Sequence, residues 1–371
     1  MKKFIYMDAA ASWLKPQPVI ETEVDFLTNL YANAGRGICA RASNVDNMIA
    51  NVRQDIANFI GAKPENIVFT SGATDGLNRI VNILVNQDWY SNKSTFAVSD
   101  LDHHSARLPW QELLCRGKIG KEIVCELDED LNIKIDSVPK TDFLIITAMS
   151  NVLGVPQDIE KIIKVAKSKN PNVITIVDAS QYVVHEKINV KKWGCDFMVF
   201  SGHKIGANTG VGVMYIREPN KYYPDKFGGG MVSKVKDDSN LILNKAPEKF
   251  EAGTLPLTQI IGLGVAIKSV GNWNCTDLIH YMYDELVKIP NIKMLTKRDA
   301  CMISFVPDNM HVLDMGALLG AKNICVRVGN MCASWIHKKL KIDGSVRISV
   351  GPWNTMDEAK HVIETIRGVL K

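Results

Sequence analysis

The sequence predicts an α/β fold: a large domain with a mainly parallel sheet flanked by helices, followed by a smaller C-terminal α/β domain. Short apolar runs rich in β-branched residues, such as 174–177 and 197–200, alternate with segments whose apolar residues recur at helical spacing. These runs end abruptly in polar or ionisable residues, which is typical of buried parallel strands. At 371 residues the chain also exceeds a usual single domain. We therefore expect a large domain over residues 12–264 and a small domain formed by 1–11 and 265–371.

Composition narrows the class of protein. The chain is 46% hydrophobic and 23% charged, and its net charge of +4 comes from scattered lysines, so we expect no nucleic-acid partner. No apolar run is long enough to cross a bilayer, and the first one is interrupted by Asp8, so we expect neither a membrane anchor nor a secretory signal. Eight cysteines without a CxxC pair indicate free thiols in a reducing, cytoplasmic compartment.

The elements of the large domain follow from apolar spacing and from residues that start or end helices. Pro18 sits where a helix would begin, Ser43 can cap a second helix, and Gly61 follows the last apolar residue of that helix. The expected helices cover 19–31, 43–60, 77–85, 159–166 and 256–270, and the expected strands cover 66–70, 96–98, 122–124, 143–147, 174–178, 196–200 and 211–216. Residues 231–244 are polar with alternating valines, which indicates an exposed hairpin or lobe.

An acid and a lysine end two of these strands. Asp178 closes the run 174–177, and Lys204 follows the run 197–200. Ligands of open α/β sheets bind at the carboxyl ends of strands, so the two side chains could meet one ligand. A lysine that holds an aldehyde, opposite an acid that keeps a pyridine nitrogen protonated, suits pyridoxal 5'-phosphate. The alternative, a strand-end cap and a solvated cation, is less favoured because Ser201 and His203 lie beside the lysine.

Three further segments of the large domain carry candidate residues. The turn 71–76 joins a strand to a helix and could bind a phosphate at the helix start, although such turns also serve simply to cap helices. His103 and His104 have no supporting metal ligands nearby, so we expect no metal and favour an imidazole stacked on a flat cofactor. Asn151 adds a polar group at another strand end.

The small domain is expected to contain helices over 277–287, 312–319 and 355–370 and strands over 302–306 and 324–328. Arg347 lies in an apolar run, where a buried guanidinium needs an anion such as a substrate carboxylate or a structural acid. Cys332 lies just beyond a strand, where it is either a small buried hydrophobe or a functional thiol.

Taken together, these stretches resemble the cysteine desulfurase and selenocysteine lyase family, a branch of the fold-type I, class V aminotransferase-like enzymes that use pyridoxal 5'-phosphate. The most specific matches are SGHK at 201–204, VDASQ at 177–181, SNVLG at 150–154, FEAGT at 250–254 and the Arg327-x-Gly-x-x-Cys332 segment. The last is similar to the group whose cysteine lies on a short, ordered loop. Many members of that group feed iron-sulfur cluster assembly.

The resemblance implies a role for each matching residue. Lys204 would hold the aldehyde of the cofactor, Asp178 would pair with the pyridine nitrogen, and Gln181 would bond the ring hydroxyl. His103 would stack on the ring and assist catalysis. The remaining cofactor contacts would come from Ala73, Thr74, Asn151, Ser201 and His203, and from Thr254 of a neighbouring subunit in a homodimer.

The substrate side follows from the same resemblance. Asn151, Arg327 and Arg347 would bind the substrate, L-cysteine or also L-selenocysteine, and Cys332 would take its sulfur and pass it to a sulfur-acceptor protein. Three residues depart from the family, which often has histidine at the positions of Cys39, Asn330 and Met331. The turn 205–210 also differs from the usual tyrosine-glycine-proline-threonine turn. These changes concern proton handling around the thiol.

Two other functions fit parts of the pattern. In another fold-type I enzyme, such as an aminotransferase or an epimerase, Cys332 would be incidental. In a scaffold without catalysis, the fold would serve only to bind sulfur-transfer partners. A Cys332→Ala variant separates the first from a desulfurase, and the colour of the purified protein separates the second.

Overall fold

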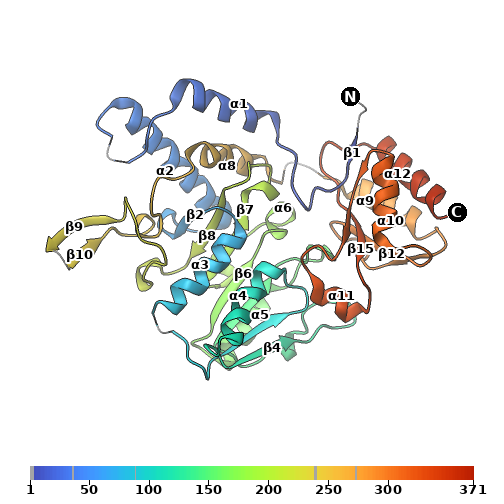
Figure 1. Cartoon of the computed structure of the whole chain (residues 1–371), viewed down its shortest axis with the longest axis horizontal. Helices are drawn as coiled ribbons and strands as arrows, with labels where there is room; N and C mark the ends of the chain where they lie inside the picture. Colours follow the sequence, from blue (N-terminus) through green and yellow to red (C-terminus); the bar gives the residue numbers. More distant parts are fainter. Residues whose placement is uncertain (1–3, 36, 88, 238–239, 272–273) are drawn as a thin grey trace.

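The computed structural model describes residues 4–35, 37–87, 89–237, 240–271 and 274–371. A large α/β part and a smaller one lie side by side, with the C-terminal helices in the smaller part (Figure 1). The mixed α/β class and the large, mainly parallel sheet expected from the sequence are confirmed.

The large sheet has seven strands in the order β2-β8-β7-β6-β5-β3-β4. Strand β8 is antiparallel to both of its neighbours, while β7, β6, β5, β3 and β4 run parallel. Their carboxyl ends therefore meet at one edge. The strands are β2 (Ile67–Thr70), β3 (Thr95–Ser99), β4 (Lys121–Cys125), β5 (Phe143–Thr147), β6 (Ile174–Asp178), β7 (Phe197–Ser201) and β8 (Gly212–Ile216).

Helices cover both faces of this sheet because successive strand residues point to opposite sides. Ile176 and Val199 face one core with α3 and α4, whereas Val177 and Phe200 face another with α2, α5 and α8. The helices are α1 (Gln17–Asp25), continued as a π-helical segment over Phe26–Leu30, α2 (Ala40–Ile60), α3 (Ala73–Val85), α4 (His104–Cys115), α5 (Ile159–Lys169), α6 (Tyr182–His185), α7 (Val190–Trp193) and α8 (Leu257–Ser269).

The starts of three helices differ from expectation. Helix α3 begins at Ala73, four residues before the predicted start at 77. Ser43 is not a cap but lies inside α2, because the alanines at 40 and 42 let the helix begin one turn earlier, after Cys39. The end at Gly61 is confirmed, and its φ of +73° is a left-handed conformation that glycine adopts freely. Helix α4 was not expected, and it begins directly after His103.

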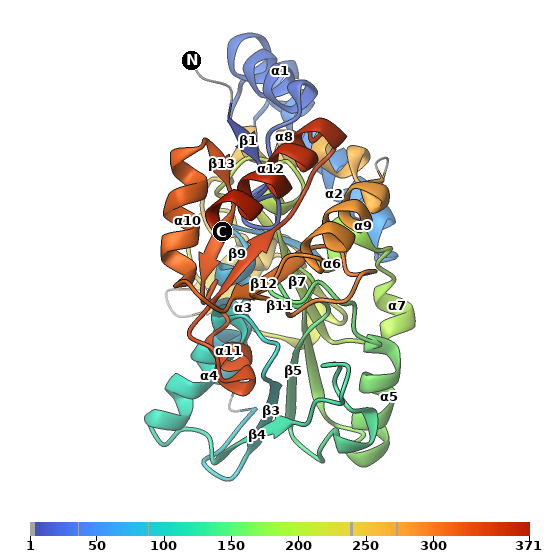
Figure 2. The same cartoon turned by 90° about the vertical axis from the view of Figure 1, so that its right-hand side faces the viewer.

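The small part contains an antiparallel sheet in the order β11-β12-β15-β14. Its strands are β11 (Ile292–Met294), β12 (Ile303–Pro307), β14 (Arg327–Gly329) and β15 (Ser345–Ile348), and its helices are α9 (Thr276–Leu286), α10 (Val312–Ala321), α11 (Ser334–Leu340) and α12 (Met356–Val369). Helices α9, α10 and α12 share one apolar core with this sheet, and Figure 2 shows them over it.

The single strand expected over 324–328 is wrong. The chain changes partner after β13 (Ile324–Cys325), which pairs in parallel with β1 (Ile5–Tyr6), and β14 then joins the four-stranded sheet. The N-terminal segment is thereby fastened to the small part before it passes the carboxyl edge of the large sheet. The boundary predicted at 264/265 falls within α8, and the division into domains remains a prediction.

The exposed hairpin predicted over 231–244 is formed by β9 (Val232–Asp237) and β10 (Asn240–Leu243), with residues 238–239 outside the described part. It projects from the large part on the side away from the small part (Figure 1). Within the described residues, no helix combines the length and apolarity needed to cross a membrane.

Candidate active site

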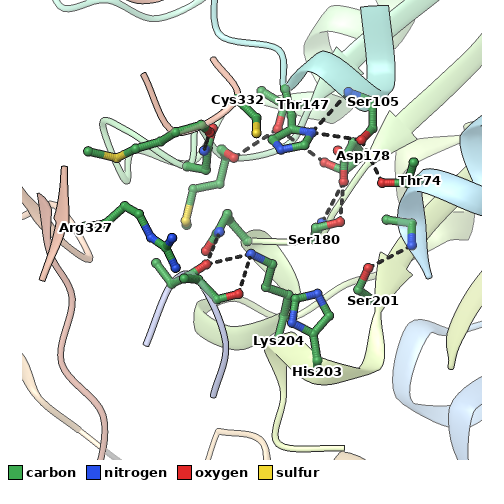
Figure 3. A pocket seen from close by; sticks show the side chains of 18 of the residues that line it. Thr74, Ser105, Thr147, Asp178, Ser180, Ser201, His203, Lys204, Arg327 and Cys332 are labelled. Atoms are coloured by element: carbon green, nitrogen blue, oxygen red, sulfur yellow. Dashed lines mark hydrogen bonds between the residues drawn. The ribbon is translucent and has the colours of Figure 1, made fainter. Parts of the chain in front are cut away.

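A cavity of about 270 Å³ lies at the carboxyl edge of the large sheet, where the small part meets it. Figure 3 shows Lys204, Asp178 and Cys332 around this hollow. Every predicted site residue except Thr254 lines it, namely Ala73, Thr74, His103, Asn151, Asp178, Gln181, Ser201, His203, Lys204, Arg327, Cys332 and Arg347. Thr254 is exposed and lies outside the residues that line this cavity.

Lys204 lies in a short turn directly after β7. Its Nζ donates to the carbonyl oxygens of Ala10 at 2.6 Å and Ala11 at 3.1 Å. Burial, assisted by the nearby positive charge of Arg347, lowers the pKa of Lys204 to about 8. A useful fraction of this amine is therefore neutral, and so nucleophilic, near neutral pH.

Asp178 closes β6 and is only 5% exposed. Its carboxylate accepts hydrogen bonds from the backbone N–H of Ser180 at 3.0 Å and from the Ser180 hydroxyl at 2.6 Å. Gln181, in the same segment, donates to the carbonyl of Ala10 at 2.8 Å. These bonds fix the acid at the edge of the cavity, on the strand adjacent to β7.

His103 caps α4, and its Nδ1 accepts a hydrogen bond from the N–H of Ser105 at 3.1 Å. Burial is the main cause that lowers the pKa of His103, and Asp178 opposes the shift. The ring is therefore favoured in its neutral form, with its proton on Nε2. Its position beside Asp178 and Lys204 suits a flat ring that flanks a bound ligand.

The start of α3 forms another part of the cavity wall on the large part of the molecule. The N–H of Ala73 donates to Ser201 Oγ at 2.8 Å, and the hydroxyls of Thr74 and Ser105 lie 2.7 Å apart. A Cβ on Gly212 would lie 2.6 Å from Gly72 Cα, so the turn before α3 can sit this close to β8 only because position 212 is glycine. Backbone N–H groups at a helix start and the positive end of the helix dipole favour an anion at such a position.

His203 adds no positive charge to this wall. Burial and the neighbouring Lys204 lower the pKa of His203 to about 4, so its imidazole is neutral at neutral pH.

The cavity wall formed by the small part is built around a cluster of charges, in which Asp8 and Arg347 are buried and Arg327 is exposed. Asp8 accepts from Arg347 at 2.9 Å and from Arg327 at 2.7 Å, so Arg347 has the structural acid that the sequence left as one alternative. A second Arg347 nitrogen donates to the carbonyl of Asn151 at 2.7 Å. Arg347 is 2% exposed, and its Nε has no partner among the described residues.

Cys332 lies on the loop between β14 and α11, and it is exposed. Met331 and Cys332 have φ values of +51° and +55°, left-handed conformations that are unusual away from glycine. Asn151 Nδ2 donates to the carbonyl of Met331 at 2.7 Å, which ties the loop to the segment after β5. Cys332 lines the same cavity as Lys204, but from the small part of the molecule.

Sequence reasoning missed two contributors, Asp8 and Asp102. Asp8 was read only as an interruption of an apolar run, and its arginine partners lie more than 300 residues away in the sequence. Asp102 is fully buried and accepts from the N–H groups of Ser99 and Thr147, both at 2.6 Å, which joins the ends of β3 and β5. Burial raises the pKa of Asp102 to about 7. Only its position after a predicted strand could have signalled it.

The turn after Lys204 also has a structural explanation. Gly206 has a φ of +94°, and a Cβ there would lie 2.9 Å from Pro16 and 3.2 Å from Trp13. Trp13 and Pro16 therefore take the space beside this turn.

A mainly parallel sheet whose strand ends bring a lysine and an acid to one cavity defines an aminotransferase-like α/β enzyme. The profile of the aminotransferase class-V family matches residues 5–362. The chain is 32% identical over 389 residues to the cysteine desulfurase of Wigglesworthia glossinidia brevipalpis, covering 99% of this chain and 93% of that protein. It is also 32% identical over 381 residues to the cysteine desulfurase of Escherichia coli O8 (strain IAI1), covering 98% of this chain and 93% of that protein. This chain therefore belongs to the aminotransferase class-V family.

Solved structures agree with the sequence relatives. The apo structure of a cysteine desulfurase from Thermococcus onnurineus NA1 has a TM-score of 0.92 and 30% identity, and the match covers 99% of this chain and 94% of that one. The cysteine desulfurase CsdA from Escherichia coli, in an S-sulfonic acid form, has a TM-score of 0.90 and 27% identity over the same shares. The resemblance inferred from the motifs is thus confirmed.

Proposed function

We propose that this protein is a cysteine desulfurase that uses pyridoxal 5'-phosphate, converts L-cysteine to L-alanine and leaves a persulfide on Cys332. The observation that carries the proposal is the convergence of Lys204, Asp178 and Cys332 on one cavity. The cysteine desulfurases among the relatives support the same activity. An aminotransferase or an epimerase would need the lysine and the acid but has no use for the thiol.

The cavity fits the cofactor on structural grounds. Gly212 leaves room for the turn that presents the N-terminus of α3, and that wall suits a phosphate. The buried Asn151 Oδ1 and Arg347 Nε are left without partners among the described residues, which is costly unless a ligand satisfies them. Lys204, Asp178 and His103 would hold the ring, with contacts from Ala73, Thr74, Gln181, Ser201 and His203. When bound, the cofactor supplies an electron sink for the substrate Cα.

Lys204 serves as the base. Its amine, with a pKa of about 8, can take the Cα proton of the substrate and return a proton later. The carbonyls of Ala10 and Ala11 hold Nζ at the edge of the cavity. Arg347 Nε and the side chain of Asn151 would orient the substrate carboxylate, with Arg327 at the cavity wall.

Cys332 carries out the sulfur step. Its thiolate attacks the substrate sulfur, a new S–S bond forms, and the Cβ–S bond of the substrate breaks with its electron pair left on carbon. Protonation of that carbon gives alanine, and the sulfur remains on Cys332.

The partners follow from this chemistry. A persulfide must be removed for the next turnover, so we propose a sulfur-acceptor protein that feeds iron-sulfur cluster assembly or another sulfur-transfer pathway. L-selenocysteine, with the same amino-acid frame, is a second substrate to test. We also propose a homodimer in which Thr254, exposed outside the cavity, would complete the phosphate site of a second copy. The reactive thiol suits a reducing compartment, here the cytoplasm.

The test is to supply the cofactor-loaded protein with cysteine or selenocysteine and to measure alanine. Wild type should release alanine, and Cys332→Ala should not, while it retains the cofactor and still exchanges the substrate Cα proton. Cys115→Ala, which removes another exposed cysteine, is the matched control and should behave as wild type. Alanine release by Cys332→Ala would contradict the role of the thiol. A purified protein that never binds the cofactor would instead favour the scaffold.

A further inference from the structure

Two hydrogen bonds that run in opposite directions fasten the loop carrying Cys332 to α4. The backbone N–H of His104 donates to the carbonyl oxygen of Cys332 at 2.8 Å. In return, the N–H of Ser334 donates to Nε2 of His104 at 3.2 Å, and Ser334 Oγ lies 3.1 Å from the same ring nitrogen. One residue of the large part therefore binds the loop on both sides of its thiol.

Both bonds give a partner to a backbone N–H group at the start of a helix. His104 is the first residue of α4 and Ser334 is the first residue of α11, and N–H groups at a helix start have no partner within the helix. Ala333, which precedes α11, has no side chain that could cap it. Each helix start is thus capped by the other element, and Cys332 lies between the two bonds.

A tryptophan reinforces this contact. The ring of Trp335 lies 4.3 Å from Cζ of Arg107 and meets the ring of His104 edge-on, with centroids 5.1 Å apart. Arg107 is buried and is itself held by ion pairs with Glu122 and Asp100. Trp335 therefore packs on a side chain that cannot easily move.

We propose that His104 and Trp335 are positioning residues that hold the Cys332 loop in the conformation needed for the sulfur step. The inference rests on the proposed function, because it assigns the loop the task of presenting the thiol to the substrate. Met331 and Cys332 keep their left-handed backbone only where the surroundings enforce it. Without the reciprocal caps, the loop would relax and the thiol would lose its place.

Three substitutions of His104 remove its two hydrogen bonds to the Cys332 loop to different degrees. His104→Gln keeps the backbone donor and offers an amide oxygen as acceptor, His104→Ala keeps only the donor, and His104→Pro keeps neither. Proline is well tolerated at the first position of a helix. His103 already has φ −65° and ψ 151°, which is the conformation that a following proline requires, so α4 should still form.

We expect the three variants to separate the sulfur step from the cofactor. Cofactor content, Cα-proton exchange and KM for cysteine should remain near wild type. The kcat for alanine release should fall about ten-fold in His104→Ala and further in His104→Pro, with most of it restored in His104→Gln, because small displacements of reacting groups cost large factors in rate. Leu108→Ala, on the exposed side of α4, is the matched control.

A readout independent of activity is amide hydrogen exchange over residues 330–336. Exchange there should accelerate in His104→Ala, His104→Pro and Trp335→Ala, but not in Trp335→Phe, which keeps a ring over Arg107. Unchanged kcat and unchanged exchange in His104→Pro would overturn the proposal, as would a parallel loss of cofactor and kcat. If wild type releases no alanine, the proposed function fails, while the exchange measurement still tests the contact.

Discussion

Two walls of the cavity are held in place by different means. The large-domain wall carries Asp178 and Lys204, and the small-domain wall carries Cys332 and Arg347. Asp178 and Lys204 follow two adjacent strands of one sheet, so the hydrogen bonds between β6 and β7 set their spacing. Cys332 lies on a loop with left-handed backbone, and bonds from Asn151 and His104 of the large part fasten it. One wall is fixed within a sheet, whereas the other depends on contacts across the molecule.

The difference separates two steps of the proposed chemistry. Cofactor binding and proton removal belong to the wall that one sheet defines. Sulfur transfer belongs to the small-domain wall, whose position depends on contacts between the large and the small part. Substitutions in those contacts can change the sulfur step while the cofactor site remains. The N-terminal segment touches both walls, because Asp8 binds two arginines and the next residues bind Lys204.

The largest effect is expected at the large-domain wall. Lys204→Ala removes the base and the amine that holds the cofactor, so alanine release should fall more than about a thousand-fold. The yellow absorbance of the bound cofactor should disappear with it. Lys161→Ala, on the exposed face of α5, should change neither quantity. A Lys204→Ala protein that kept both would contradict the account of this wall.

A smaller effect is expected where the two walls meet. Asp8→Asn removes the counter-charge of the buried Arg347, and losing one partner of a buried ion pair costs about 3 kcal/mol. The midpoint of denaturant unfolding should fall, and alanine release should drop with it. Asp158→Asn, which breaks the exposed pair with Lys161, should leave the midpoint nearly unchanged. An unaltered midpoint in Asp8→Asn would show that the cluster is not structural.

The pH dependence of cofactor capture tests whether the pKa of Lys204, in the large-domain wall, is lowered. Only the neutral amine of Lys204 attacks the aldehyde, and burial has lowered the pKa of that amine from 10.5 to about 8. In protein from which the cofactor has been removed, the rate of capture should rise about ten-fold per pH unit up to about 8 and then level off. A rate that continues to rise toward 10.5 would show an ordinary, solvated lysine.

The sequence predicted correctly that the residues of the large-domain wall lie together at one edge of the sheet, and there is a physical reason for this. Asp178, Ser201 and Lys204 follow apolar runs directly, so local pattern places them at one edge of the sheet. The small-domain wall was harder to predict because its parts are distant in sequence. Nothing local connects Asp8 with Arg347, and nothing local shows that the predicted strand 324–328 divides between two sheets.

The same reasoning explains the reciprocal caps. For the pair His103 and His104 the sequence predicts an imidazole stacked on a cofactor and no metal. The contact of His104 with Ser334 arises only when α4 and α11 meet. The start of α2 shows a smaller error of the same kind, since Ser43 is a good cap by type but the helix begins earlier. Local residue type predicts what a residue can do, and the fold decides whether it does so.

The most direct test of the central claim is to locate the sulfur after the cofactor-loaded protein has reacted with cysteine labelled at sulfur. Mass spectrometry of peptides from wild-type protein should find one labelled sulfur atom on Cys332, removable by a thiol reductant, in step with alanine release. Label on another cysteine, or alanine released with Cys332 unlabelled, would contradict the assignment of that thiol as the sulfur acceptor.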